Sequence, residues 1–207
     1  MKNMNENGRS MVEMLGVLAI IGVLSAGGLA GYSKAMFKHK LNSTMEQITM
    51  LVTNIRTKYG SQGNYLNLST ANAYKLGIIP PTMTTDSGAT LSNPFKGAVT
   101  LTLVDARATS AADLAKAATS TATGFALTYN GLPQEACIAL ATADFGSGAG
   151  SGFISVGVGA TAATQGLIPP IGYVGSSEGK AYGLSAAVTE CKKEANADKA
   201  AITWYFY

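Results

Sequence analysis

Glu13 is a carboxylate placed directly against a long apolar run near the start of the chain. The stretch Ser10-Met11-Val12-Glu13 fits an S-x-x-E capping box, in which the glutamate returns to the backbone N–H of the capping serine. The helix dipole also stabilises a carboxylate in the first turn, by about 0.3–1 kcal/mol. Alternatively, Glu13 enters a membrane and needs a cationic partner there. Capping accounts for Glu13, but it does not account for Gly8 directly before Arg9.

No set of catalytic or metal-binding residues accompanies Glu13. His39 is the only histidine and follows the apolar run, which excludes Ser-His-Asp triads and multi-histidine metal sites. The glycine-rich stretch 146–152 lacks the Lys-Ser/Thr ending of a phosphate loop, so it predicts a surface loop. A net charge of +3 is too small to argue for a nucleic-acid partner. We therefore predict no enzyme, no cofactor, no bound metal and no specific nucleic acid.

Cys137 and Cys191 are the only cysteines, and their spacing is not a zinc pattern. In an oxidising compartment they would form one disulfide closing a loop of more than 50 residues. The chain-entropy model gives such a bridge about 4 kcal/mol. In the cytosol they would be two buried thiols. Charged residues make up only 13 % of the chain, which is common in proteins that work outside the cell, and export would favour the disulfide.

A long helix is predicted to carry Glu13. Met14 to Tyr32 contains no charged residue, and its 19 residues are close to the ~20 that span a bilayer core. Apolar residues then recur at spacings of three and four, which predicts one buried helical face. Its members are Leu41, Met45, Ile48, Val52, Ile55 and Tyr59. We expect one helix from about Ser10 to about Tyr59, ended by Gly60 and Gly63.

Two further features of this helix bear on membranes. Gly27 and Gly31 form a G-x-x-x-G pair, which lets membrane helices approach closely; the alternative is a general loosening of the helix. Basic residues lie on both sides of the apolar run, with more on the C-terminal side. They are Lys2 and Arg9 before it, and Lys34, Lys38 and Lys40 after it. Read literally, the positive-inside rule would place the C-terminal side in the cytosol.

The rest of the chain predicts a small mixed domain. Four runs alternate apolar and small or polar residues, which predicts an antiparallel sheet with one apolar face. They lie at residues 99–104, 125–129, 154–158 and 202–207. Short helices are expected after Ser69, at 110–117, from Pro133 and at 185–193. The predicted fold class is α+β, with the long N-terminal helix packed on an antiparallel sheet and small helices in the connections.

The N-terminal stretch resembles a type IV prepilin. That family has a short polar leader ending in Gly, a new N-terminus, Glu at its fifth position and an apolar run. A cut between Gly8 and Arg9 would make Glu13 the fifth residue. The resemblance implies that a prepilin peptidase cuts after Gly8 and methylates the amine of Arg9. It also implies that Glu13 pairs with the N-terminal amine of a neighbouring subunit. The family usually has an apolar first mature residue, where this chain has Arg9.

The resemblance divides the chain into a leader at 1–8, a long helix at 9–60 with its transmembrane half at 14–32, and a globular head at 61–207. The cysteine separation, the helix that begins in 132–137 and the head size are similar to type IVb pilins. The implied function is a structural subunit that is held in the bacterial inner membrane and then polymerised into an extracellular filament. Its implied partners are copies of itself, prepilin peptidase and the pilus assembly machinery. The alternatives are a minor pilin or secretion pseudopilin, and a membrane-anchored adhesin or binding module.

Overall fold

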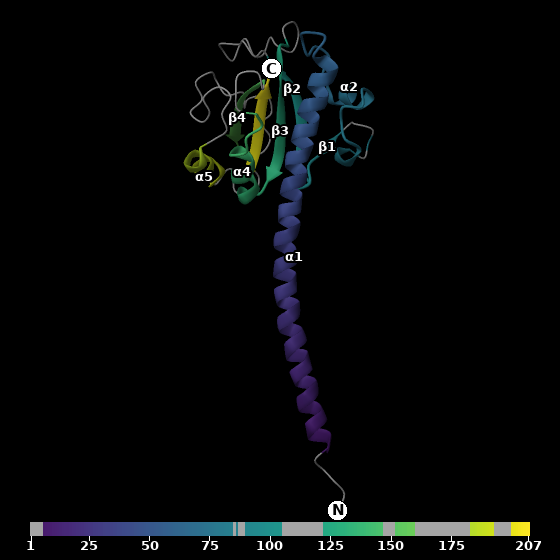
Figure 1. The fold of residues 1–207 in the computed structure, drawn as a ribbon, viewed down its shortest axis with the longest axis vertical. Coiled ribbons are helices and arrows are strands. Elements are labelled where there is room, and N and C mark those ends of the chain that lie inside the picture. Colours follow the sequence, from purple (N-terminus) through teal and green to yellow (C-terminus); the bar gives the residue numbers. More distant parts are fainter. Residues whose placement is uncertain are drawn as a thin grey trace, which may run out of the picture. The chain divides into compact units, whose positions relative to one another are not determined.

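A computed structural model describes residues 6–84, 86, 90–104, 122–146, 152–159, 183–192 and 200–207, with side chains from Met11 onward (Figure 1). The chain forms two compact units, Met1–Asn42 and Ser43–Tyr207. The boundary between them falls inside helix α1, which runs from Glu6 to Tyr59. Each unit is described below by itself.

The first unit is the N-terminal part of α1. Every described side chain from Met11 to Ala35 is exposed, and most of them are apolar. Helix α1 begins at Glu6, so the prediction that Ser10 caps the helix is wrong for the uncut chain. The physical reason is that no proline lies among the first ten residues, so helical geometry continues back through Gly8. Ser10 therefore lies inside the helix.

The second half of α1 is amphipathic, as the spacing of its apolar residues predicted. The apolar residues buried along it are Ile48, Leu51, Val52, Ile55 and Tyr59, with Leu41 and Met45 half-buried. On the opposite face, the hydroxyls of Thr49, Thr53 and Thr57 each donate to the carbonyl four residues earlier, at 2.8–2.9 Å. The helix ends where the N–H of Gly60 bonds the carbonyl of Arg56. Gly63, the second predicted terminator, has a φ of +66°, which favours glycine.

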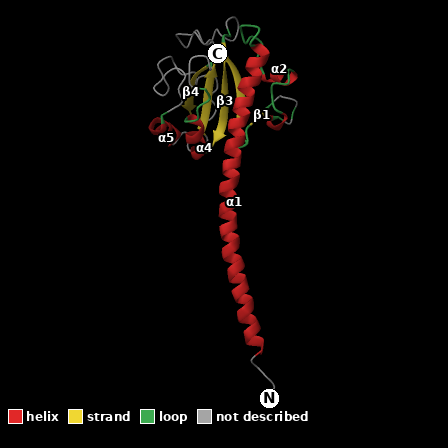
Figure 2. Cartoon of the chain, viewed as in Figure 1, coloured by secondary structure: helices red, strands yellow, loops and turns green. Residues whose placement is uncertain are grey.

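The head contains a five-stranded antiparallel sheet in the order β1-β2-β3-β5-β4 (Figure 2). Its strands are β1 (Leu91–Ser92), β2 (Ala98–Val104), β3 (Gly124–Leu132), β4 (Phe153–Gly159) and β5 (Ala200–Phe206). The four predicted runs are β2 to β5. The sequence did not indicate β1, because two residues are too few to show alternation. The turn into β2 packs tightly, since a Cβ on Gly97 would collide with the carbonyl of Asn130.

The prediction of a single apolar face is wrong for the central strands. All of β5 is buried, and β3 is buried from Gly124 to Tyr129. A second cluster of Val104, Ala126 and Tyr205 packs on the opposite side from Leu127 and Trp204. Ile154 also joins this second cluster, whereas the sequence placed it with Val156. A register shift between Phe153 and Ser155 turns Ile154 to the other face.

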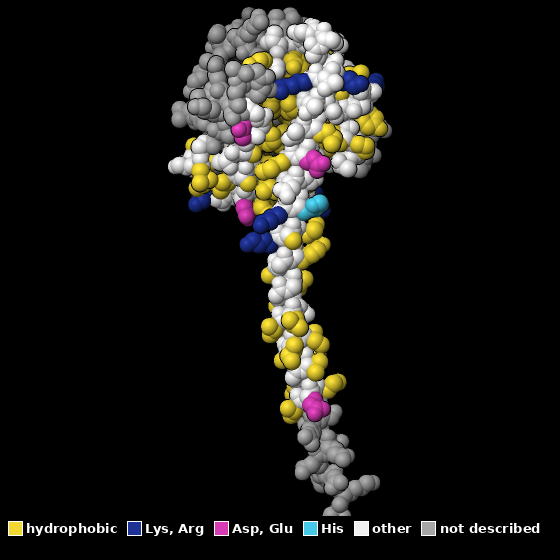
Figure 3. Space-filling model, in the orientation of Figure 1, with side chains coloured by type: hydrophobic (Ala, Val, Ile, Leu, Met, Phe, Trp, Pro, Cys, Tyr) yellow, Lys and Arg dark blue, Asp and Glu magenta, His cyan; other side chains and the backbone are white. Residues whose placement is uncertain are grey.

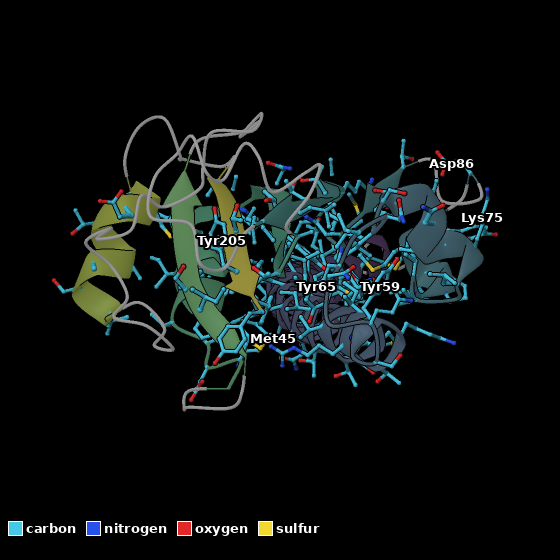
Figure 4. All side chains as sticks on the ribbon, turned by 90° about the horizontal axis from the view of Figure 1, so that it is seen from above. Met45, Tyr59, Tyr65, Lys75, Asp86 and Tyr205 are labelled. Atoms are coloured by element: carbon cyan, nitrogen blue, oxygen red, sulfur yellow. A yellow bond between two sulfur atoms is a disulfide. The ribbon has the colours of Figure 1, made fainter. Side chains whose placement is uncertain are left out.

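An aromatic row connects α1 to the sheet. Tyr59 lies 5.9 Å from Tyr65, and Tyr65 lies 5.1 Å from Phe125, between ring centroids (Figure 4). Phe125 stacks on Phe206 of β5 at 5.3 Å. The guanidinium of Arg56 lies 5.3 Å from the centre of the Phe206 ring, in cation–π geometry. The amphipathic half of α1 is thereby held to β3 and β5, which is the packing that the sequence predicted.

Short helices occupy the connections. Helix α2 (Thr70–Lys75) is capped by Ser69, whose Oγ accepts from the N–H of Asn72 at 3.2 Å, as expected. A 3₁₀ turn, η1, covers Pro81–Met83. Helix α4 (Gln134–Ala141) starts directly after Pro133, and α5 (Leu184–Lys192) starts one residue before its predicted position. The helix expected at 110–117 and most of the loop expected at 146–152 lie outside the described residues.

Candidate functional site

Glu13 lies near the N-terminal end of α1, a helix that is long and apolar enough to cross a membrane. It is the single charged side chain among the described residues Met11 to Ser33. By length and composition, Met11–Tyr59 qualifies as a membrane-spanning candidate. Figure 3 shows the apolar side chains on all visible sides of this part of α1. Apolar side chains exposed in such numbers require either lipid or other protein chains to cover them.

Helix α1 contains all three residues of the predicted processing and assembly site, Gly8, Arg9 and Glu13. The backbone is helical through all three residues, so Glu13 lies about 6 Å along the axis from Arg9, at four residues of separation. A peptidase needs an extended, accessible backbone at the bond it cuts. A cut between Gly8 and Arg9 would require this bond to leave helical geometry first. Gly8 lowers the cost of that change, because glycine is about 1 kcal/mol less favourable than alanine in a helix.

The glycines of the apolar segment are not required by packing within the chain. A Cβ added at Gly27 or Gly31 would meet no heavy atom within 4 Å, and the same is true at Gly28. Each of these glycines still costs about 1 kcal/mol relative to alanine in a helix. Since the single chain gains no contact from them, the reason for their presence lies in contacts outside the chain or in a need for a weaker helix.

The predicted disulfide is present between Cys137 of α4 and Cys191 of α5. The two Cα atoms are 5.9 Å apart, the sequence separation is 54, and both cysteines are fully buried. Helix α4 packs against β4, β5 and α5, and α5 packs against β4. The bridge therefore links α5 to α4, which packs against strands β4 and β5.

The described titratable groups do not form a catalytic arrangement. Burial raises the pKa of Tyr129 far above its usual value, and the ring lies edge-on to Trp204 at 5.6 Å. Desolvation lowers the pKa of Arg56 and raises that of Tyr65. These groups are packing elements of the core. Among the residues that the structure describes, no three His, Cys, Asp or Glu side chains lie close enough to hold a metal ion.

Asp86 is the described carboxylate whose pKa departs most from its ordinary value. The pKa falls to about 2, because the hydroxyl and N–H of Thr90 and the hydroxyl of Thr84 donate to the carboxylate. Asp86 is exposed, so this network ties Thr84 and Thr90 to one carboxylate at the surface. The sequence analysis missed Asp86 and Arg56. Asp86 could have been recognised from its threonine-rich turn, but nothing in the sequence places Phe206 under Arg56.

The fold and the N-terminal helix define the class of protein. An amphipathic helix packed on an antiparallel sheet, preceded by an apolar helical segment and followed by a disulfide-linked C-terminal region, is the fold of type IV pilins. The crystal structure of a type IVb pilin from Salmonella typhi is similar, with a TM-score of 0.50 and 18 % identity. The match covers 79 % of this chain and 97 % of that one.

The family follows from the sequence of the same region. A sequence model of the Bundlin family matches residues 34–207, and the chain belongs to this family. The major structural subunit of the bundle-forming pilus of Escherichia coli O111:H- is 24 % identical over 196 residues, covering 94 % of this chain and 92 % of the relative. The subunit of the same description from Escherichia coli O127:H6 is 26 % identical over 144 residues, covering 70 % and 68 %.

Proposed function

We propose that this chain is a structural subunit of a type IV pilus, and that it is a major subunit. The observation that carries the proposal is the exposed apolar helix from Met11 to Tyr32 in a chain of the Bundlin family. Two relatives described as major structural subunits of the bundle-forming pilus support the choice of a major over a minor role. In the filament, the apolar helices of neighbouring copies cover one another.

Processing precedes assembly in this proposal. A prepilin peptidase cuts between Gly8 and Arg9 and methylates the new amine. The five-residue offset to Glu13 supports this position for the cut, because it places one carboxylate within reach of the amine of a neighbouring copy. After the cut Ser10 caps the shortened helix, so Glu13 falls in its first turn, where the helix dipole stabilises the carboxylate. The two roles of Glu13 are therefore compatible.

The membrane stage uses the same helix. Before assembly, the Met14–Tyr32 segment spans the bacterial inner membrane, since its 19 residues correspond to about 28 Å of helix against a ~30 Å hydrocarbon core. Gly27 and Gly31 then permit close approach of neighbouring helices in the filament. The absence of intrachain contacts at both glycines supports this role.

The proposal predicts that the chain is recovered in sheared extracellular filaments. Cells are sheared, filaments are sedimented, and the chain is quantified in the filament and membrane fractions by mass spectrometry. A major subunit should be the most abundant protein of the filament fraction. A minor pilin or pseudopilin would be a trace component there. Recovery only as a monomer in the membrane would contradict the proposal and favour an anchored binding module.

A further inference from the structure

The buried face of helix α1 changes in character along the head. Its first turn there, Ser43–Gln47, carries two buried polar side chains, Thr44 at 0 % and Gln47 at 8 % exposure. The rest of this face, up to the end of the helix, buries apolar side chains. We call Ser43–Gln47 the polar turn, and it starts at the first residue of the second compact unit. The polar turn is therefore where α1 first enters the core of that unit.

Gln47 lacks a hydrogen bond that its burial requires. Its Oε1 atom is buried, and no residue in the described part of the chain donates to it. A buried acceptor without a donor destabilises the packed state, because its bond to water is lost and nothing replaces it. The typical cost shifts an equilibrium by about 5- to 150-fold, which is comparable to the contribution of one buried apolar side chain. The polar turn is therefore held more weakly than an apolar turn of the same face.

The far end of the same helix is fastened to the head by specific contacts. The side-chain amide of Asn54 donates to the carbonyl of Ile78 at 2.9 Å. The guanidinium of Arg56 lies over the ring of Phe206, and Tyr59 belongs to the aromatic row. All of these contacts lie beyond the polar turn along α1, so a movement of the polar turn breaks none of them.

We propose that the polar turn is a strap that separates from the head while the part of α1 from Ile48 to Tyr59 stays packed. The motion is a bend of α1 away from the sheet, and long helices curve gently while their hydrogen bonds persist. Separation brings the carbonyl of Gln47 into contact with water. It also frees about 7 Å of helix, at about 1.5 Å for each residue of the polar turn. The strap lets α1 change its angle to the sheet without unwinding, by local opening at the weakest contacts.

The test measures how often the polar turn opens, from the rate at which a buried thiol reacts with iodoacetamide in the full chain in detergent. Thr44→Cys and Val52→Cys are nearly isosteric replacements on the buried face of α1. Thr44 is fully buried and Val52 is 8 % exposed, so the closed structure favours faster labelling of the Val52→Cys thiol. The strap predicts the opposite order. The Thr44→Cys thiol should react about tenfold faster than the Val52→Cys thiol, or more, because it is uncovered without unfolding of the head.

The role of Gln47 is tested in the chain that carries Thr44→Cys. Gln47→Leu removes the unsatisfied carbonyl, so the polar turn should open less often. Labelling of the Thr44→Cys thiol should then slow about tenfold, which lies within the range for one unsatisfied acceptor. Both chains carry the same cysteine, so any loosening by the cysteine itself cancels. Gln62→Leu is the matched control, since Gln62 is exposed just beyond the end of α1, and it should leave the labelling rate unchanged.

Two results would overturn the strap. Labelling of the Thr44→Cys thiol that is no faster than that of the Val52→Cys thiol would mean that the buried face opens as one unit. A Thr44→Cys labelling rate that Gln47→Leu leaves unchanged would mean that the unsatisfied carbonyl does not weaken the polar turn. Circular dichroism checks that each variant is folded. If Thr44→Cys does not fold, the half-buried Met45 provides the reporter as Met45→Cys, and the slowing by Gln47→Leu decides.

Discussion

Replacing Glu13 by alanine is expected to abolish filaments while the precursor still accumulates in the membrane. Glu13 is the single charged side chain among the described residues Met11 to Ser33, so no other group there can replace its charge. In the assembled filament its proposed partner is the N-terminal amine of a neighbouring copy. Removing one partner of a buried charge pair typically costs about 2–5 kcal/mol, much of it from the charge left unpaired. Every subunit contact would carry this cost.

The measurement is the yield of sheared filaments relative to the amount of subunit in the membrane. Glu13→Gln keeps the shape of the side chain and should fail in the same way, because the negative charge is lost. Glu46→Ala is the matched control, since Glu46 is an exposed carboxylate on the same helix beyond the apolar segment. Filament yields from Glu13→Ala that equal the wild-type yield would leave Glu13 with a capping role only.

Removing the disulfide is expected to destabilise the head by about 4 kcal/mol, the chain-entropy value for a loop of this length. Cys137 and Cys191 are fully buried, so alanine is the better replacement, because serine would add a buried hydroxyl. The expected fall in Tm is about 8–16 °C, at about 2–4 °C for each kcal/mol in a chain of this size. Thermal unfolding of the full chain in detergent, followed by circular dichroism, measures this change.

The single cysteine variants serve as controls for the double variant. Cys137→Ala, Cys191→Ala and the double variant all break the same bond, so their losses should agree to within about 1 kcal/mol rather than add. The reduced wild-type chain should unfold near the same temperature as the variants. A double variant with the Tm of the oxidised wild-type chain would mean that the packing of α4 against α5 holds the head together without the bridge.

The sequence predicted the elements of the head better than their burial. The stripe from Ile48 to Tyr59 repeats at 3.6 residues, and only a helix with one buried face gives that pattern. The alternation in the sequence places Ala126, Thr128 and Thr203 on the face opposite the predicted apolar one, because they are small or polar. They are buried, and the hydroxyls of Thr128 and Thr203 bond each other at 2.8 Å across β3 and β5. Alanine and threonine are tolerated both in the core and at the surface. Tertiary packing therefore decides whether they are buried, and the sequence alone does not show it.

The candidate site was predictable to a different degree at each residue. Glu13 and the two cysteines stand out by type and position alone. The helical start at Glu6 was missed, because Ser10 offers a good cap and the sequence does not show whether the preceding residues continue the helix. The same ambiguity makes Ser10 a cap for the cut chain and an interior residue for the uncut one.

The mass of the mature N-terminus tests the central claim most directly. The chain is purified from sheared filaments, digested, and its N-terminal peptide is identified by mass spectrometry. The account predicts a peptide that begins with N-methylated Arg9, which places Glu13 at the fifth position. A mature chain that keeps Met1, or that begins at any residue other than Arg9, would contradict the proposed processing and the pairing of Glu13 that depends on it.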